Sequence, residues 1–162
     1  MWLTLVLVVL AVVAAGFALG GIIGAPWVPT FRKDIEAILD DARLEKGDLL
    51  IELGCGDGRL VAAAAARGIQ VIGYEINPLL WLIAATRTLR YKNAHIRLGN
   101  FWNKDWSQAD AVVTFLIPRS MGKIETKAAK ELKTGSRLIS YVFSLPNKKP
   151  AQKRERWFVY KY

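Results

Sequence analysis

The sequence predicts an α/β protein in which a doubly wound, mostly parallel sheet is preceded by one N-terminal transmembrane helix. Three observations support this prediction: short apolar segments alternate with helical patterns, a glycine-rich turn follows the first of those segments, and no charged side chain occurs before Arg32. Alternating strands and helices are typical of parallel sheets with helices on both faces. The chain has 162 residues and no internal repeat, which fits one such domain.

The N-terminal segment, residues 1–25, is expected to be a transmembrane anchor. Residues 2–23 are almost entirely apolar, and this run exceeds the ~20 residues that a helix needs to cross a bilayer. A cleaved signal peptide would have Lys or Arg before a shorter apolar run. A helix that is apolar on every face also finds little room in the core of a small domain. A retained anchor is therefore preferred to both alternatives.

The distribution of charge predicts the orientation of this anchor. The formal net charge of +9 lies beyond the apolar run, which Arg32 and Lys33 closely follow. Positive residues next to a membrane helix favour the cytoplasmic side. We therefore expect a single-pass membrane protein with its folded domain on the cytoplasmic side, or at the mitochondrial inner membrane in a eukaryote. The single cysteine, Cys55, excludes an intramolecular disulfide and agrees with a reducing compartment.

Residues 26–47 are expected to form a linker and an amphipathic helix. Pro26 and Pro29 oppose helix formation in the linker, and apolar residues recur at helical spacing over residues 31–44. Gly47 ends this helix before the first strand. Residues 48–162 form the predicted domain. Its elements are expected at 48–53 (strand), 58–67 (helix), 70–74 (strand), 78–91 (helix), 95–98 (strand), 111–115 (strand), 121–132 (helix), 137–143 (strand) and 157–162 (antiparallel strand, inside the sheet or at its edge).

The turn after the first strand carries the strongest functional signal. Glycines occupy positions 54, 56 and 58, and Glu75 ends the second strand. Glycine lets the backbone approach a ligand closely, and an acidic residue ~20 positions after such a turn can bind ribose hydroxyls. Arg59 stands where a dinucleotide-binding turn needs its third glycine, so a nicotinamide site is disfavoured. The carboxylates of Glu52 and Asp57 would repel a pyrophosphate and suit a ligand that carries an ammonium and a sulfonium.

Several motifs, taken in order, resemble one enzyme family. The Glu-x-Gly-x-Gly-x-Gly pattern at 52–58 resembles the first motif of class I S-adenosylmethionine-dependent methyltransferases. Three further motifs restrict the resemblance to a smaller group of these enzymes: Pro-Trp-Val-Pro-Thr at 26–30, Gly-Tyr-Glu-Ile-Asn-Pro at 73–78 and Phe-Leu-Ile-Pro at 115–118. Together with the apolar N-terminus, they resemble the small membrane-anchored protein-lysine methyltransferases of mitochondria and their prokaryotic relatives. The resemblance covers roughly residues 20–145.

This resemblance implies a Rossmann-like methyltransferase domain at 48–162 that uses S-adenosylmethionine as its cofactor. Members of the family methylate lysines of inner-membrane proteins such as the adenine nucleotide carrier and the ATP synthase c-ring. The expected partners are therefore a membrane protein that supplies a lysine and the lipid bilayer around the anchor. Nucleic acid is not an expected partner, because an anchored enzyme meets lipid first. No metal is expected, because His95 has no cluster of ligands to join.

The resemblance and the side-chain chemistry assign roles around the cofactor. Glu75 would accept hydrogen bonds from both ribose hydroxyls. Asn100 would bind adenine, although the family usually has an aspartate there, and Phe101 or Ile76 would line the ring; a plain turn asparagine is the alternative. Either Glu52 or Asp57 would balance the cofactor's ammonium. The turn that packs against the methionine part consists of Gly54, Cys55, Gly56, Asp57 and Gly58.

The expected substrate side follows the fourth strand. Ile117 and Pro118 lie at the edge where doubly wound sheets hold substrates, and they would line a lysine channel; a simple turn is the alternative. No catalytic residue is assigned, because transfer from a sulfonium to a neutral amine mainly needs alignment and exclusion of water. Two other functions stay open: methylation of a membrane-soluble small molecule such as a quinone or aminolipid, and a non-enzymatic scaffold that binds S-adenosylmethionine.

Overall fold

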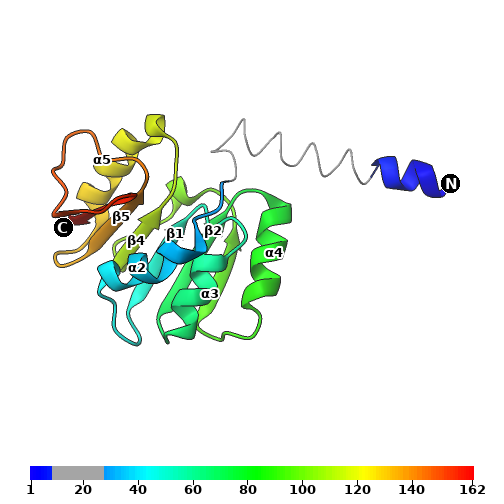
Figure 1. The fold of residues 1–162 in the computed structure, drawn as a ribbon, viewed down its shortest axis with the longest axis horizontal. Coiled ribbons are helices and arrows are strands. Elements are labelled where there is room, and N and C mark those ends of the chain that lie inside the picture. Colours follow the sequence, from blue (N-terminus) through cyan, green and yellow to red (C-terminus); the bar gives the residue numbers. More distant parts are fainter. Residues whose placement is uncertain (9–27) are drawn as a thin grey trace.

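The computed structural model describes residues 1–8 and 28–162 (Figure 1). Most of the predicted anchor at 1–25 lies outside the described residues. Residues 2–8 are helical and exposed. None of the helices in the described part of the chain is both long and apolar enough to span a bilayer. The folded domain can be followed from residue 28 onward.

A seven-stranded sheet forms the centre of the domain, in the order β3-β2-β1-β4-β5-β7-β6. The neighbours from β3 to β5 are parallel, and β7 is antiparallel to both β5 and β6. The chain runs outward from β1 to β3 and then returns to the other side of β1 for β4. This confirms the predicted Rossmann-like sheet. The strands are β1 Leu49–Leu53, β2 Gln70–Glu75, β3 Ala94–Leu98, β4 Ala111–Thr114, β5 Arg137–Tyr141, β6 Gln152–Lys153 and β7 Trp157–Lys161.

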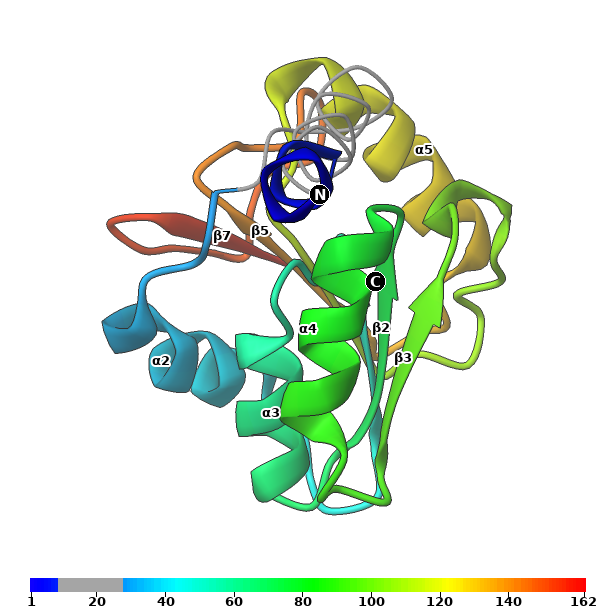
Figure 2. The same ribbon diagram turned by 90° about the vertical axis from the view of Figure 1, so that its right-hand side faces the viewer.

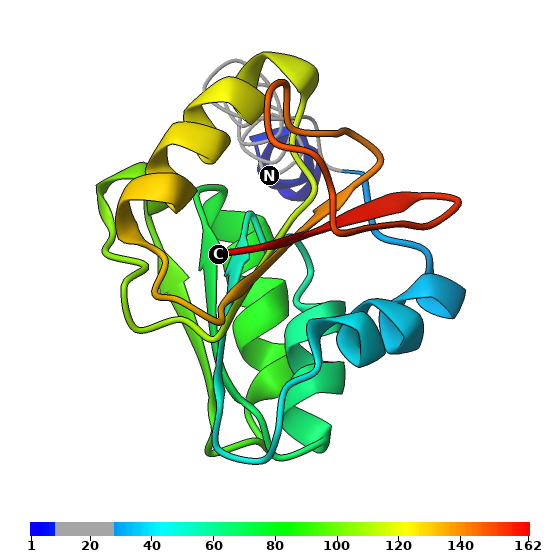
Figure 3. The same cartoon turned by 90° about the vertical axis from the view of Figure 1, so that its left-hand side faces the viewer.

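Helices cover both faces of this sheet. Three helices, α2 to α4, lie on one face and α5 lies on the other (Figures 2 and 3). A separate apolar cluster fills the space on each face. α4 begins at the predicted residue because the side chain of Asn77 accepts the amides of Leu79 and Leu80, and Pro78 occupies the first turn. The helices are α2 Arg32–Ala42, α3 Arg59–Ala66, α4 Pro78–Thr88 and α5 Met121–Glu131, with the 3₁₀ helices η1 Phe101–Asn103 and η2 Pro118–Ser120.

The C-terminal part of the sheet departs from the prediction at two points. The strand expected at 137–143 ends at Tyr141, because Val142 adopts a φ of +70°. The short strand β6 was not expected, and it forms a hairpin with β7. β7 therefore lies inside the sheet, between β5 and β6.

Two buried carboxylates connect α2 to the end of β5 and to the β6–β7 hairpin. Asp34 accepts hydrogen bonds from the hydroxyl of Tyr141 (2.5 Å) and the guanidinium of Arg156 (2.9 and 3.1 Å). Asp41 accepts two from Arg154 (2.8 and 2.9 Å). Burial opposes the ionisation of Asp34, yet the bonds from Tyr141 and Arg156 lower its pKa. The bond from Arg154 is the main reason that the pKa of Asp41 is lowered too.

Candidate functional site

The glycine turn lies at the carboxyl end of β1, between the parallel neighbours β2 and β4. The chain order reverses at this point, and doubly wound sheets bind their ligands there. Gly54, Gly56 and Gly58 have φ values of +76°, +54° and +74°, in the left-handed region that favours glycine. The amides of Gly54 and Cys55 both donate to the carbonyl of Tyr74, at 2.9 Å each. The turn is thereby held against the end of β2.

Two of these glycines are needed for different reasons. A Cβ at Gly58 would lie 2.8 Å from the Cβ of Ala84 and 2.9 Å from its Cα, so glycine allows α4 to pack against the start of α3. A Cβ at Gly54 would meet only the Cδ2 atom of Leu116, at 3.7 Å. Space therefore remains over Gly54, where the backbone can face a ligand.

Glu75 ends β2 and is bonded to the glycine turn. Its Oε2 accepts the amide of Gly56 at 2.9 Å, and its Oε1 accepts the amides of Ile76 and Asn77 at 2.9 and 2.8 Å. The side chain is buried, and burial raises its pKa although these three amides act in the opposite direction. A carboxylate has about four acceptor sites. Glu75 can therefore accept a further hydroxyl from a ligand.

Glu52 lies in β1, two residues before the turn. It is buried, and its Oε2 has no hydrogen-bond partner among the described residues. Burial raises its pKa well above the ordinary value, and the neighbouring charges of Asp57 and Glu75 add to this effect. A buried carboxylate oxygen without a partner is costly in free energy. A cationic or N–H-bearing group of a ligand would satisfy it.

Asp57 has strong partners already. Its carboxylate forms ion pairs with Arg59 (2.8 Å) and Arg87 (2.7 Å). Burial opposes its ionisation, but the hydrogen bonds from these two guanidinium groups lower its pKa. Arg87 was not expected here, because it belongs to the last turn of a different helix, α4, and no local pattern signals the contact. Of the two carboxylates considered for an ammonium, Glu52 is the one with an unsatisfied oxygen.

The residues expected around adenine follow β2 and β3. The amide of Gly99 donates to the carbonyl of Glu75 (2.8 Å), which brings the ends of these strands together. Asn100 is exposed, and its Oδ1 accepts the amide of Trp102 (3.0 Å) as the cap of η1. The same edge of the sheet carries two half-buried apolar side chains, Ile76 and Phe101. The binding of adenine by this group stays a prediction.

The side chain of Cys55 packs inside the domain. Its Sγ would lie 2.9 Å from a Cβ at Gly73 on β2, and the residue is buried. Burial, followed by the charges of Glu52 and Glu75, raises the pKa of the thiol well above its ordinary value. A thiol that keeps its proton is a poor nucleophile. Cys55 can therefore contribute its backbone to a site at the turn, but not a reactive thiolate.

Ile117 and Pro118 follow β4 at the same edge of the sheet as the turn. Ile117 is half-buried and Pro118 is exposed, where η2 begins. The buried Leu116 lies between β4 and these residues and reaches the space over Gly54. This position of Leu116 could not be predicted, because an apolar residue after a strand has no sequence feature that separates a ligand contact from core packing.

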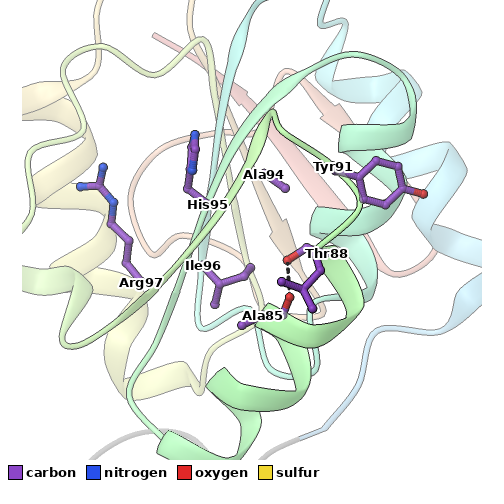
Figure 4. Close-up of a pocket in the computed structure, with 8 residues that line it drawn as sticks. Ala85, Thr88, Tyr91, Ala94, His95, Ile96 and Arg97 are labelled. Carbon is purple, nitrogen blue, oxygen red and sulfur yellow. Dashed lines mark hydrogen bonds between the residues drawn. The ribbon is translucent and has the colours of Figure 1, made fainter.

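A separate pocket of about 380 Å³ opens between α4 and the edge strand β3 (Figure 4). In the close-up, Tyr91 and Thr88 lie on the α4 side, whereas His95 and Arg97 project from the other side of β3. None of the predicted site residues lines this pocket. Across the described ranges, no group of three His, Cys, Asp or Glu side chains is placed to hold a metal ion.

The family of this chain follows from its similarity to known proteins. The family model for the ANTKMT methyltransferase domain matches residues 52–152. The chain belongs to this family. The matched span contains the glycine turn, Glu75 and the two residues of the expected substrate side, Ile117 and Pro118.

Relatives of this ANTKMT-family chain include proteins with assigned names. It is 35% identical over 130 residues to the human (Homo sapiens) ATP synthase c-subunit lysine N-methyltransferase, a match that covers 77% of this chain and 54% of that protein. It is 32% identical over 134 residues to a protein-lysine N-methyltransferase of Saccharolobus islandicus, covering 78% of this chain and 82% of the relative. The chain thus spans about half the length of the human relative.

A solved structure supports the fold of this family member. The RNA methyltransferase from Salinibacter ruber, crystallised with S-adenosyl-L-homocysteine, matches with a TM-score of 0.79 at 25% sequence identity. The match covers 83% of this chain and 93% of that chain. Nearly the whole described domain therefore has the architecture of a class I methyltransferase.

Proposed function

We propose that this chain is an S-adenosylmethionine-dependent methyltransferase that N-methylates a lysine of a membrane-associated protein. The observation that carries the proposal is the arrangement of carboxylates at the glycine turn, where Glu75 is bonded to Gly56 and Glu52 has a buried oxygen without a partner in the described part. Such a site favours a nucleoside that carries an ammonium group, because the ammonium would satisfy the free oxygen of Glu52. The named relatives support a lysine of a protein as the acceptor.

The residues at the turn fit this cofactor. Glu75 would accept a ribose hydroxyl at the site that its three backbone partners leave open. Glu52 would accept the ammonium, while Asp57 keeps its pairs with Arg59 and Arg87. The remaining cofactor residues would contribute backbone, amide or apolar contacts: Gly54, Cys55, Gly56, Gly58, Ile76, Asn100 and Phe101.

The chain would align the acceptor and exclude water. When bound, S-adenosylmethionine would supply a methyl group from a sulfonium, whose sulfur would keep the electron pair of the broken carbon–sulfur bond when the carbon–nitrogen bond forms. Leu116, Ile117 and Pro118 would surround the lysine side chain with apolar surface. These surroundings disfavour the charged ammonium, so the lysine loses a proton to solvent and presents its lone pair. The nitrogen regains a positive charge as a methylammonium, and no dedicated base is needed.

Membrane attachment belongs to the same proposal. Residues 1–25 would anchor the domain as a single-pass protein, with the domain on the cytoplasmic side, or at the mitochondrial inner membrane in a eukaryote. Support comes from the lack of charge before Arg32. Further support comes from Arg59, which donates to the carbonyl of Thr30 (3.2 Å) and so keeps the segment before α2 beside the glycine turn. A lysine near the membrane surface would then meet the site at a raised effective concentration.

Labelling of membranes tests this function. Membranes from cells that lack the chain are incubated with the purified full chain and radiolabelled S-adenosylmethionine, and the label is expected on lysine in a protein band. Glu75→Ala should abolish the labelling and the calorimetric binding of S-adenosylhomocysteine. Glu45→Ala removes an exposed carboxylate before β1, at the opposite edge of the sheet, and should change neither.

The same experiment separates the alternatives. Label that is extracted into organic solvent would identify a membrane-soluble small molecule as the acceptor. Binding of S-adenosylhomocysteine without label in either fraction would indicate a scaffold. A chain that does not bind S-adenosylhomocysteine would contradict the cofactor assignment.

A further inference from the structure

Val142 has a backbone conformation that a β-branched residue rarely adopts. Its φ is +70°. The amide of Phe143 donates to the carbonyl of Tyr141 (3.0 Å), which closes a three-residue turn around Val142. A turn of this kind with a positive φ at its centre is rare and strained. Val142 is 42% exposed, so packing of its side chain in the core does not explain why a valine occupies this position.

One carboxylate on α2 binds two residues that contact the strained turn. The amide of Val142 donates to the carbonyl of Arg156 (2.6 Å), and the guanidinium of Arg156 is bound to Asp34. The hydroxyl of Tyr141 donates to the same carboxylate at 2.5 Å. Asp34 is buried. Tyr141, which precedes the strained residue, and Arg156, which accepts its amide, are thus both fixed to one buried group.

The turn also lies next to the site at the glycine turn. β4 and β5 are parallel neighbours whose register pairs continue to the end of β4. One position further, the ring centroids of Phe115 and Tyr141 are 4.8 Å apart. Val142 directly follows the end of β5, and Leu116, the residue that reaches the space over Gly54, follows the end of the parallel neighbour β4. Because the carboxyl ends of parallel strands meet at one edge of a sheet, this exposed apolar residue lies at the same edge as the position assigned to the methyl donor.

We propose that Val142 forms a wall of the channel through which the substrate lysine reaches the methyl group, and that Asp34 and Arg156 are positioning residues that hold this wall. The proposal rests on the proposed function. An isopropyl group matches the aliphatic stem of a lysine, and contact along the stem removes water from the amine, which favours its neutral form. Backbone strain of this kind is concentrated at functional sites.

Two variants of Val142 test the wall. In the membrane-labelling assay, Val142→Gly should lower kcat/KM for the labelled protein by about tenfold, mainly through KM, because the apolar contact is lost. Its Tm should rise, since glycine adopts a positive φ without strain. Val142→Ala should give an intermediate loss. Neither variant should change the affinity for S-adenosylhomocysteine. The matched control is Leu89→Ala, at a residue 80% exposed just after α4, which should leave all three quantities unchanged.

The role of Asp34 is tested in two backgrounds. Asp34→Asn should raise KM for the labelled protein in the native chain. It should add nothing to the KM of Val142→Gly, because a glycine does not need the carboxylate to hold its conformation. If Asp34→Asn lowers Tm equally in both backgrounds and leaves KM unchanged, Asp34 has a structural role only.

The outcomes distinguish this inference from the function on which it rests. If the native chain labels no membrane component, the proposed function itself fails. If the native chain labels a protein and both Val142 variants retain its kcat/KM, only the wall is disproved. This decision depends on the Val142 variants alone, so it stands even if Asp34→Asn fails to fold.

Discussion

Glu52 and Asp57 show how two carboxylates at one turn acquire opposite properties. Asp57 is paired with two guanidinium groups, and its pKa is lowered. Glu52 is buried with an unsatisfied oxygen, and its pKa is raised well above the ordinary value. The difference arises from which residues the tertiary structure places beside each group. Glu52 therefore keeps its proton to a higher pH than an ordinary glutamate does, and an incoming ammonium would displace that proton.

This displacement predicts a pH dependence of ligand binding. The ammonium of S-adenosylhomocysteine would lower the pKa of Glu52 in the complex, so binding should release a proton wherever the free protein is protonated. Affinity should rise as the free protein loses this proton with increasing pH, and it should level off above the raised pKa. Calorimetry in buffers of different ionisation enthalpy measures the proton release. Glu52→Gln should abolish it, and release that persists in this variant would contradict the role of Glu52.

The glycines of the turn should respond differently to alanine. Gly58→Ala places a Cβ against Ala84 and should lower the free energy of unfolding by about 1–3 kcal/mol from overpacking, in addition to the cost of a left-handed alanine, about 1–2 kcal/mol. Gly54→Ala has only the cost of the left-handed conformation, but the added methyl group fills the space over the turn and should abolish binding of S-adenosylhomocysteine. Thermal unfolding and calorimetry on the same samples check both. A Gly58→Ala variant as stable as the native chain would contradict the packing argument.

At the scale of elements, most of the fold could be predicted from the alternation of apolar strands with helical patterns. Two features could not. β6 is too short to show an apolar alternation. No sequence feature marks the end of β5, because valine is a residue that favours strands. Only the hydrogen bond of Val142 to the distant Arg156 and the turn around it impose the left-handed conformation. The contacts of α2 with the C-terminal hairpin were equally hidden, since they join opposite ends of the domain.

The candidate site was predictable to the extent that it is local. The glycine turn and Glu75 form a short motif with a fixed spacing, and the structure brings them into contact. The unsatisfied oxygen of Glu52, the pairing of Asp57 and the approach of Leu116 to Gly54 depend on packing between elements. A sequence pattern contains no information on such distances.

The ion pairs between α2 and the hairpin should make the fold sensitive to acid. The pKa values of Asp34 and Asp41 are lowered in the folded chain, so the unfolded chain binds more protons near the ordinary pKa. Their stabilisation is therefore complete above about pH 4 and is lost as the pH falls through the folded values. Asp41→Asn should lower Tm at neutral pH and flatten the decline of Tm in acid, followed by circular dichroism. Glu45→Gln, at an exposed residue, should follow the native profile; an unaltered profile in Asp41→Asn would disprove the contribution of this pair.

At the scale of the whole molecule, the proposed anchor and the site should be separable. The double substitution Val12→Arg and Val13→Arg places two arginines within the apolar run. Each arginine should disfavour insertion of this segment into the bilayer by about 2.5–3.5 kcal/mol. The chain should move from the membrane pellet to the supernatant and label membrane protein more slowly, while its affinity for S-adenosylhomocysteine stays unchanged. Sedimentation and calorimetry measure the two effects. A doubly substituted chain that still sediments with membranes would show that another part of the chain binds the bilayer.

The bond between Glu75 and the amide of Gly56 has a consequence for how quickly a nucleoside can be captured. The glycine turn acquires its shape while the chain folds, so the conformational entropy lost in ordering it does not weaken binding. Arrival of the sugar then requires its hydroxyls to join or replace existing donors on an oxygen that is already oriented. Capture should therefore follow simple one-step kinetics, without a slow phase that reports rearrangement of the backbone.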